Sequence, residues 1–175
     1  MEIFYKLSQL LQTPTVWIIN VLFLYALFET GRLVAQWVLR LKNRSRANEH
    51  IQAKLGSSIG GYPVLSYWAG SQEVTVNEVE IYAFRQIELI RLVTRVAPML
   101  GLVATLIPMG PALVSMANSD FVEMSELLRT AFTAVVLALI AASFTYWIAS
   151  VKKRWLAEEI VALEKHVFNR NAVTQ

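Results

Sequence analysis

The 175-residue chain contains no cysteine and only two histidines. The absence of cysteine excludes disulfides, thiol catalysis and cysteine-ligated metal sites. His50 and His166 lie far apart and outside the apolar runs, and neither has a second ligand at a metal-site spacing, so we interpret both as solvated surface residues. The sequence also lacks a nucleophile–base pair and a phosphate-binding loop. We therefore expect no enzyme, no metal and no cofactor.

Charged residues are also scarce: they make up 17% of the chain, whereas 55% of the residues are hydrophobic. Three apolar runs, at about 14–38, 96–118 and 130–151, each approach the ~20 residues that a helix needs to cross a hydrocarbon core. The sequence therefore predicts an all-α membrane protein with three transmembrane helices and long cytoplasmic helical extensions.

We divide the chain into seven predicted segments. Residues 1–12 carry apolar side chains at helical spacing, which is typical of an amphipathic helix on the membrane surface. Thr13-Pro14 begins the first transmembrane helix, because proline is tolerated at the first helical position. The segments are an amphipathic helix (1–12), a transmembrane helix (13–39), a cytoplasmic helical hairpin (40–95) with its turn at 56–63, a transmembrane helix (96–118), an outer turn (119–128), a transmembrane helix (129–151) and a cytoplasmic C-terminal helix (152–175).

The N-terminus lacks the basic start and cleavage site of a signal peptide, so we expect the first apolar run to remain as an anchor. Thirteen of the sixteen Lys and Arg residues lie in 40–95 and 151–175, whereas the connection at 118–125 has none and carries Asp120 and Glu123. The positive-inside rule then places the N-terminus outside and the C-terminus in the cytoplasm of a plasma (inner) membrane protein. We expect the basic residues behind the net charge of +3 to lie beside lipid headgroups, so this charge does not indicate nucleic-acid binding.

Ionisable groups inside or at the edge of the apolar runs are few, and each is a candidate for function because burying it in lipid is costly. Glu29 and Arg32 are three residues apart, so they either pair near the cytoplasmic interface or take part in conduction. Glu126 and Arg129 form a similar pair at the other end, where Glu126 could also concentrate protons at the mouth of a cation path. The neutral polar residues of these runs include Asn20, Thr105, Ser115, Thr130, Thr133, Ser143 and Thr145.

Small residues recur at helical spacing in the second and third runs, which is typical of helices that pack closely or line a narrow polar path. Pro108 and Pro111 each remove a backbone donor, so we expect the second helix to bend or loosen near 104–108. The residues assigned to helix packing or to this kink are Gly101, Pro108, Gly110, Pro111, Ala134 and Ala138.

The second run also contains a recognisable motif. Ala97-Pro98, Gly101-Leu102 and Thr105 resemble the A-P-x-x-G-L-x-G-T segment of the MotA/TolQ/ExbB proton channel family, with Ala104 where that family usually has glycine. Thr133-Ala134 resembles the T-A-x-G-L segment of the family's third helix. The chain departs from that segment at Leu128, where ExbB and TolQ carry a glutamate, at Val136 in place of glycine, and at Ala142 in place of proline.

The resemblance, which in topology is closest to ExbB and TolQ, implies a subunit that couples the proton motive force to work on a partner protein, with sodium as the second choice of ion. It implies a homo-oligomer, expected to be a pentamer, around single-span helices of the ExbD, TolR or MotB type that carry an aspartate. Thr105 and Thr133 would line the ion path, with Thr130 and Glu126 nearby.

One observation supports this function independently of the resemblance. The middle of the second and third runs contains no carboxylate, so a proton carrier would have to come from a partner. Two alternatives stay open. A membrane threonine often returns its hydroxyl to the carbonyl one turn earlier, and a non-conducting three-helix scaffold would show the same small-residue faces.

Overall fold

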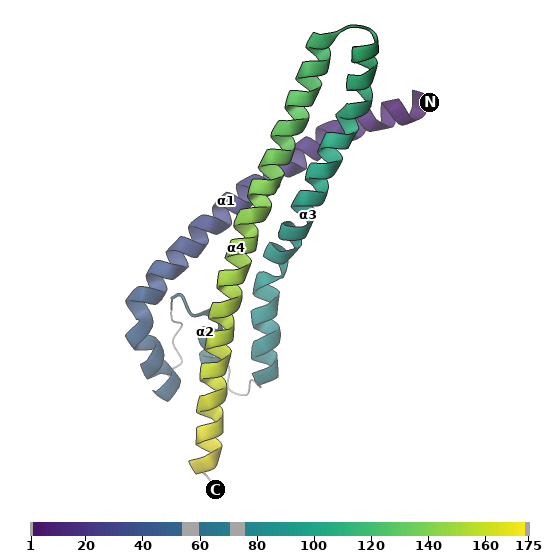
Figure 1. The fold of residues 1–175 in the computed structure, drawn as a ribbon. Helices are drawn as coiled ribbons and strands as arrows, with labels where there is room; N and C mark the ends of the chain where they lie inside the picture. Colours follow the sequence, from purple (N-terminus) through teal and green to yellow (C-terminus); the bar gives the residue numbers. More distant parts are fainter. Residues whose placement is uncertain (1, 54–59, 71–75, 174–175) are drawn as a thin grey trace. The chain divides into compact units, whose positions relative to one another are not determined.

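The structure, a computed structural model, describes residues 2–53, 60–70 and 76–173. Over these residues the chain forms the helices α1 (Glu2–Ala53), α2 (Pro63–Gly70), α3 (Val76–Ala117) and α4 (Phe121–Val173), and no strand (Figure 1). Helices α1, α3 and α4 contain stretches that are long and apolar enough to cross a membrane, at Leu10–Asn43, Asn77–Ala117 and Phe121–Lys165. The predicted class, an all-α membrane protein with three transmembrane helices, is confirmed.

Helix α1 passes through Pro14 without a break, so the predicted helix start at residue 13 is wrong. A proline removes only one backbone donor, and the neighbouring Thr15 hydroxyl donates to the Leu11 carbonyl at 2.7 Å. The structure describes the backbone of residues 2–9 but not the side chains of residues 1–9, which carry most of the predicted amphipathic face. Residues 56–59 of the predicted hairpin turn lie outside the described residues.

The connection between α3 and α4 is shorter than the predicted outer turn of 119–128, because α4 already begins at Phe121. Ser119 has a φ of 60°, which reverses the chain in one step. The Asp120 carboxylate then accepts the Glu123 backbone N–H at 3.0 Å and caps the start of α4. Residues 121–128 are therefore helical, and the turn consists of residues 118–120.

The chain divides into two compact units, each of which contains parts of the long helices. Unit 1 comprises Met1–Glu29 and Ile90–Tyr146. Its buried side chains are mostly small, and this allows its helices to approach closely. They form two clusters: Ile19, Ala104, Ala134 and Ala138, packed against Val16, Leu100 and Leu137, and then Val93, Ala97 and Ala142, packed against Leu22 and Tyr25.

Unit 2 comprises Thr30–Leu89 and Trp147–Gln175 and has a core of larger side chains. In this core α2 packs against α3 and α4, through Val64, Leu65, Trp68, Val79, Ala83, Ile87, Leu156 and Leu163. Tyr67 of α2 stacks on Tyr82 of α3, with ring centroids 4.3 Å apart. Helix α2, which the sequence did not predict, is therefore an integral part of this core.

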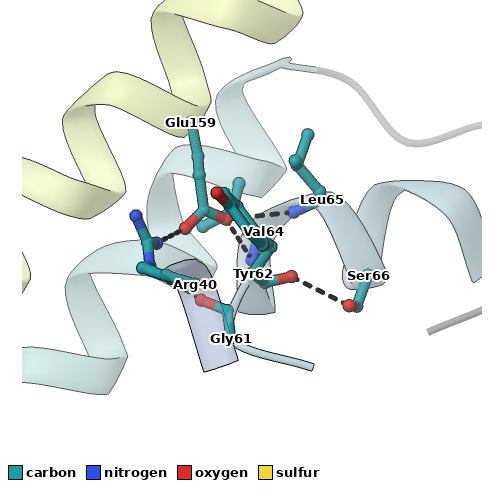
Figure 2. A network of polar contacts seen from close by, with 7 residues as sticks. All are labelled: Arg40, Gly61, Tyr62, Val64, Leu65, Ser66 and Glu159. Carbon is teal, nitrogen blue, oxygen red and sulfur yellow. Dashed lines mark hydrogen bonds and ion pairs between the residues drawn. The ribbon is translucent and has the colours of Figure 1, made fainter. Parts of the chain in front are cut away.

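A buried ion pair between Arg40 of α1 and Glu159 of α4 lies beside the start of α2 (Figure 2). The side chains of Arg40 and Glu159 are 11% and 2% exposed. Glu159 Oε2 also accepts the backbone N–H groups of Val64 at 2.9 Å and Leu65 at 3.3 Å. The N–H groups of the first helical turn have no acceptor within their own helix, so Glu159, which belongs to α4, caps the start of α2.

The Arg40 guanidinium has further partners in unit 2. Its Nε donates to the Gly61 carbonyl at 2.8 Å, and its charge lies 4.6 Å from the centre of the Tyr62 ring and 4.7 Å from that of Trp155. A buried cation needs compensation of this kind. The cluster of Arg40, Gly61, Tyr62, Trp155 and Glu159 therefore fastens α1, α4 and the residues before α2 to one another.

Candidate functional site

The small faces of α3 and α4 contact each other within unit 1. A Cβ atom added at Gly101 would lie 3.0 Å from Ala138 Cβ and 3.2 Å from Val135 Cγ2, which is closer than packed side chains normally approach. Ala104 and Ala134 are buried in the same cluster as Ala138. Gly101 therefore sits where the two helices leave no room for a side chain.

The other residues assigned to packing or to a kink have different surroundings. Pro108 and Pro111 are buried, whereas a Cβ atom at Gly110 would meet nothing within 4 Å. Helix α3 is continuous through both prolines. Because Pro108 has no N–H, the Ala104 carbonyl lacks its usual donor, and the expected loosening near 104–108 stays a prediction.

The hydroxyl groups of the candidate ion path all donate to their own helices. Thr105 donates to the Leu102 carbonyl at 2.7 Å, Thr130 to Glu126 at 3.0 Å and Thr133 to Arg129 at 2.9 Å. Each hydroxyl has thereby used its single proton, and only its oxygen lone pairs remain available. These groups can accept a hydrogen bond from water or from a protonated acid, but they cannot donate to an anion.

Two of these threonines line a pocket of about 310 Å³ between α1 and α4 in unit 1. Its lining consists of Val16, Ile19, Asn20, Arg129, Thr130, Thr133, Ala134 and Leu137. The structure thus brings Thr130 and Thr133 together with Asn20 and Arg129. Thr105 and Glu126, which the sequence grouped with them, are not part of this lining.

The acidic and basic groups near the α3–α4 turn pair differently from the sequence-based expectation. The predicted Glu126–Arg129 pair does not form, and the Arg129 guanidinium makes no ion pair with any residue that the structure describes. Instead, the Ser115 hydroxyl of α3 donates to the Glu123 carboxylate of α4 at 2.7 Å. Both groups lie near the turn, so this bond ties the ends of α3 and α4.

A second polar contact between α3 and α4 joins two threonines. Thr94 Oγ1 lies 3.1 Å from Thr145 Oγ1, and Thr145 is 0% exposed. Thr145 also donates to the Ala141 carbonyl at 2.9 Å. Thr145 was among the polar candidates of the apolar runs, whereas Thr94 lies just before the run 96–118 and was missed, although its position one turn before Ala97-Pro98 was a usable signal.

The described residues contain no group of three or more His, Cys, Asp or Glu side chains that could hold a metal ion. The pocket between α1 and α4 offers instead the hydroxyl groups of Thr130 and Thr133 and the amide of Asn20 beside Arg129. Such groups can hold water or bind a ligand through hydrogen bonds.

Comparison with known proteins identifies the family of this helical pair. No curated protein and no solved structure matches the chain significantly. The family profile of the MotA/TolQ/ExbB proton channel family matches residues 70–165, which are more than half of the chain. The match includes all of α3, most of α4, and the residues Gly101, Thr105 and Thr133. The chain therefore belongs to the MotA/TolQ/ExbB proton channel family.

Proposed function

We propose that this chain is a subunit of a proton-conducting membrane complex that couples the proton motive force to work on a partner protein. Family membership supports a proton-channel role. The need for a partner protein is supported by the composition of the second and third apolar runs: neither 96–118 nor 130–151 contains an Asp or Glu residue. The hydroxyls of the chain can order water, but no group in these segments can carry a proton through the membrane core.

The missing carrier would be the aspartate of a single-span partner of the ExbD, TolR or MotB type. When that aspartate is protonated, it is a hydrogen-bond donor and matches the free lone pairs of Thr105 and Thr133. Thr130 and Glu126 would lie toward the outer end of this path. The membrane field drives the charge movement with ~2.3 kcal/mol per elementary charge and 100 mV.

The proposed complex is a homopentamer in the inner membrane, with the N-terminus outside and the C-terminus in the cytoplasm. Exposed apolar side chains along α3 and α4, such as Leu106, Leu113 and Val136, support an assembly in which neighbouring chains and lipid cover these helices. The distribution of Lys and Arg supports the orientation. Native mass measurement in detergent would return a monomer if the assembly proposal is wrong.

The experiment that tests the ion path replaces Thr105 and Thr133 with valine, which keeps the shape and removes the hydroxyl. Proton flux is measured in proteoliposomes that contain the chain and its partner. Both variants should assemble normally and lose most of their flux. Ser143→Ala is the matched control, because Ser143 is an exposed hydroxyl that also donates to its own helix, at 2.8 Å to Leu139. Normal flux in both valine variants would show that the threonines are packing residues.

A non-conducting three-helix scaffold is the second candidate function. The observation that favours it is that Thr105, Thr130 and Thr133 all satisfy their protons within their own helices. In that case the assembly would form around the same small faces, and the membrane would stay proton-tight with or without the partner. A flux of zero in the wild-type complex, with assembly intact, would establish the scaffold.

A further inference from the structure

An apolar groove of about 220 Å³ runs between α3 and α4 in unit 2. Its floor consists of side chains of the unit 2 core, such as Ile87 and Leu156, which are already buried. Its rim is different, because Phe84 of α3 is 49% exposed and Val161 of α4 is 47% exposed. A partner that fills the groove would therefore remove further apolar surface from water.

The groove lies beyond the hydrocarbon core of the membrane. The apolar run 130–151 of α4 ends directly before the basic residues 152–154, so α4 leaves the hydrocarbon at this point. Lys153 lines the end of the groove nearest the membrane, and Glu164 lines the far end. Acyl chains therefore do not cover the exposed apolar rim, and a protein segment is the fitting occupant.

Helix α1 exposes a small apolar face at the same depth. Trp37, Val38 and Leu41 are all more than half exposed. Arg40, which lies within this stretch, pairs with Glu159 of α4. Because Glu159 lies within the part of α4 that lines the groove, this ion pair fixes Leu41 at the depth of the groove and outside the hydrocarbon.

The α1 helix of the same chain cannot fill this groove. Trp155 and Glu159, which contact Arg40, are four residues apart and share one face of α4. The groove residues Ala157 and Val161 follow them by two positions each, which is about 200° around the helix. The groove and α1 therefore lie on opposite sides of α4.

The charges of the groove and of α1 are complementary along the same direction. Glu80 and Glu164 line the end of the groove that is farther from the membrane. The sequence of α1 directly after Leu41 is basic and has no acidic residue before Glu49; its basic residues are Lys42, Arg44 and Arg46. An apolar face followed by basic residues thus matches an apolar groove followed by acidic residues.

We propose that the groove of one chain receives the α1 face of Trp37, Val38 and Leu41 from a second copy of this chain. Copies that share a membrane are related by rotation about the membrane normal, so each residue keeps its depth, and the face and the groove meet without an offset. Since the two lie on opposite sides of the chain, their contact is heterologous and closes into a ring. The contact rests on the homo-oligomer of the proposed function, but it uses no residue of the ion path.

The test is cross-linking between introduced cysteines, which is clean in a chain that has no cysteine of its own. Membranes that contain the full-length chain with Leu41→Cys and Ala157→Cys, both at exposed positions, are treated with a short bis-maleimide and analysed by denaturing electrophoresis. The double variant should give a ladder of covalent oligomers beyond the dimer, because a heterologous contact links every chain to the next. Each single variant should remain monomeric.

Leu41→Cys with Arg85→Cys is the matched control. Arg85 is also exposed, but it follows Phe84 by one position and so lies about 100° away from it around α3. This pair should give at most one tenth of the cross-linked product. Equal cross-linking of the control pair would overturn the proposal, and so would a product of the double variant that stops at the dimer, because it would show a contact between identical faces.

Native mass measurement of the same double variant in detergent separates the remaining outcomes. An oligomer without cross-linked product would mean that lipid or another protein covers the groove. This result would overturn the groove contact and leave the proposed function intact. A monomer would overturn the groove contact and the proposed assembly together.

Discussion

Removal of the Glu159 carboxylate should release the start of α2, and the expected effect can be estimated from its contacts. In Glu159→Ala the buried Arg40 cation loses its ion-pair partner, and the backbone N–H groups of Val64 and Leu65 lose their acceptor. No carbonyl of α2 can replace it, because these amides belong to the first helical turn and Pro63 opens the helix.

The breaking of a buried ion pair from one side costs about 3–5 kcal/mol. The lower end of this range applies here, because in the variant Arg40 keeps its hydrogen bond to the Gly61 carbonyl and its cation–π contacts with the Tyr62 and Trp155 rings. A loss of about 3 kcal/mol corresponds to a factor of roughly 150 in a local opening equilibrium. Glu159→Gln keeps one acceptor oxygen for the α2 amides, so its effect should be smaller, at about tenfold.

Hydrogen–deuterium exchange reads this opening directly at the two amides. Peptides that cover residues 61–68 should exchange about 150-fold faster in Glu159→Ala, whereas peptides from the unit 1 part of α4 should be unchanged. Glu158→Gln is the matched control: this neighbouring carboxylate is 63% exposed and lies 3.9 Å from Arg154, a distance at which a surface pair contributes little.

Exchange of the Val64 and Leu65 amides of Glu159→Ala within about threefold of the wild-type rate would show that Glu159 does not hold the start of α2. An equal acceleration of these amides in Glu158→Gln would show the same. A double substitution, Arg40→Met with Glu159→Met, separates the two parts of the effect. It removes both charges and leaves only the unsatisfied amides, so it should open α2 less than Glu159→Ala does.

Two further predictions concern the membrane part of unit 1. Gly101→Leu should separate α3 from α4, because the leucine side chain would overlap Ala138 and Val135, and it should lower the yield of folded protein in size-exclusion chromatography. Gly110→Leu is the control: the space around Gly110 is open, so this variant should be tolerated. Pro108→Ala should restore a backbone N–H that donates to the Ala104 carbonyl. This new hydrogen bond should shift the isotope-edited amide I band of the Ala104 carbonyl to lower wavenumber. An unchanged band would show that the carbonyl already has a partner.

The class of this protein follows from local properties of the sequence. The apolar runs at 14–38 and 130–151 lie inside α1 and α4, and the run at 96–118 ends one residue beyond α3, because the length and hydropathy of a segment decide whether it can cross a bilayer as a helix. The motif from Ala97 to Thr105 was equally local, and it indicated the family that the comparison shows. None of these inferences required knowledge of which segments touch.

Helix ends were less predictable, because they depend on a few specific bonds. The sequence suggested a boundary at Thr13-Pro14, but the loss of one amide does not end a helix that continues on both sides. It suggested a turn of ten residues after Asn118, but the φ of Ser119 and the Asp120 cap reverse the chain within three.

Only the tertiary structure decided which distant residues meet. Helix α2 is eight residues long, and the acceptor for its first amides comes from Glu159, 95 positions after Val64. Thr133 and Thr105 were grouped by family resemblance, whereas the fold places Thr133 with Thr130, Asn20 and Arg129 around one pocket. Periodicity shows which face of a helix a residue occupies, but the partner on that face depends on how separate helices pack, and a single sequence does not encode this in any local pattern.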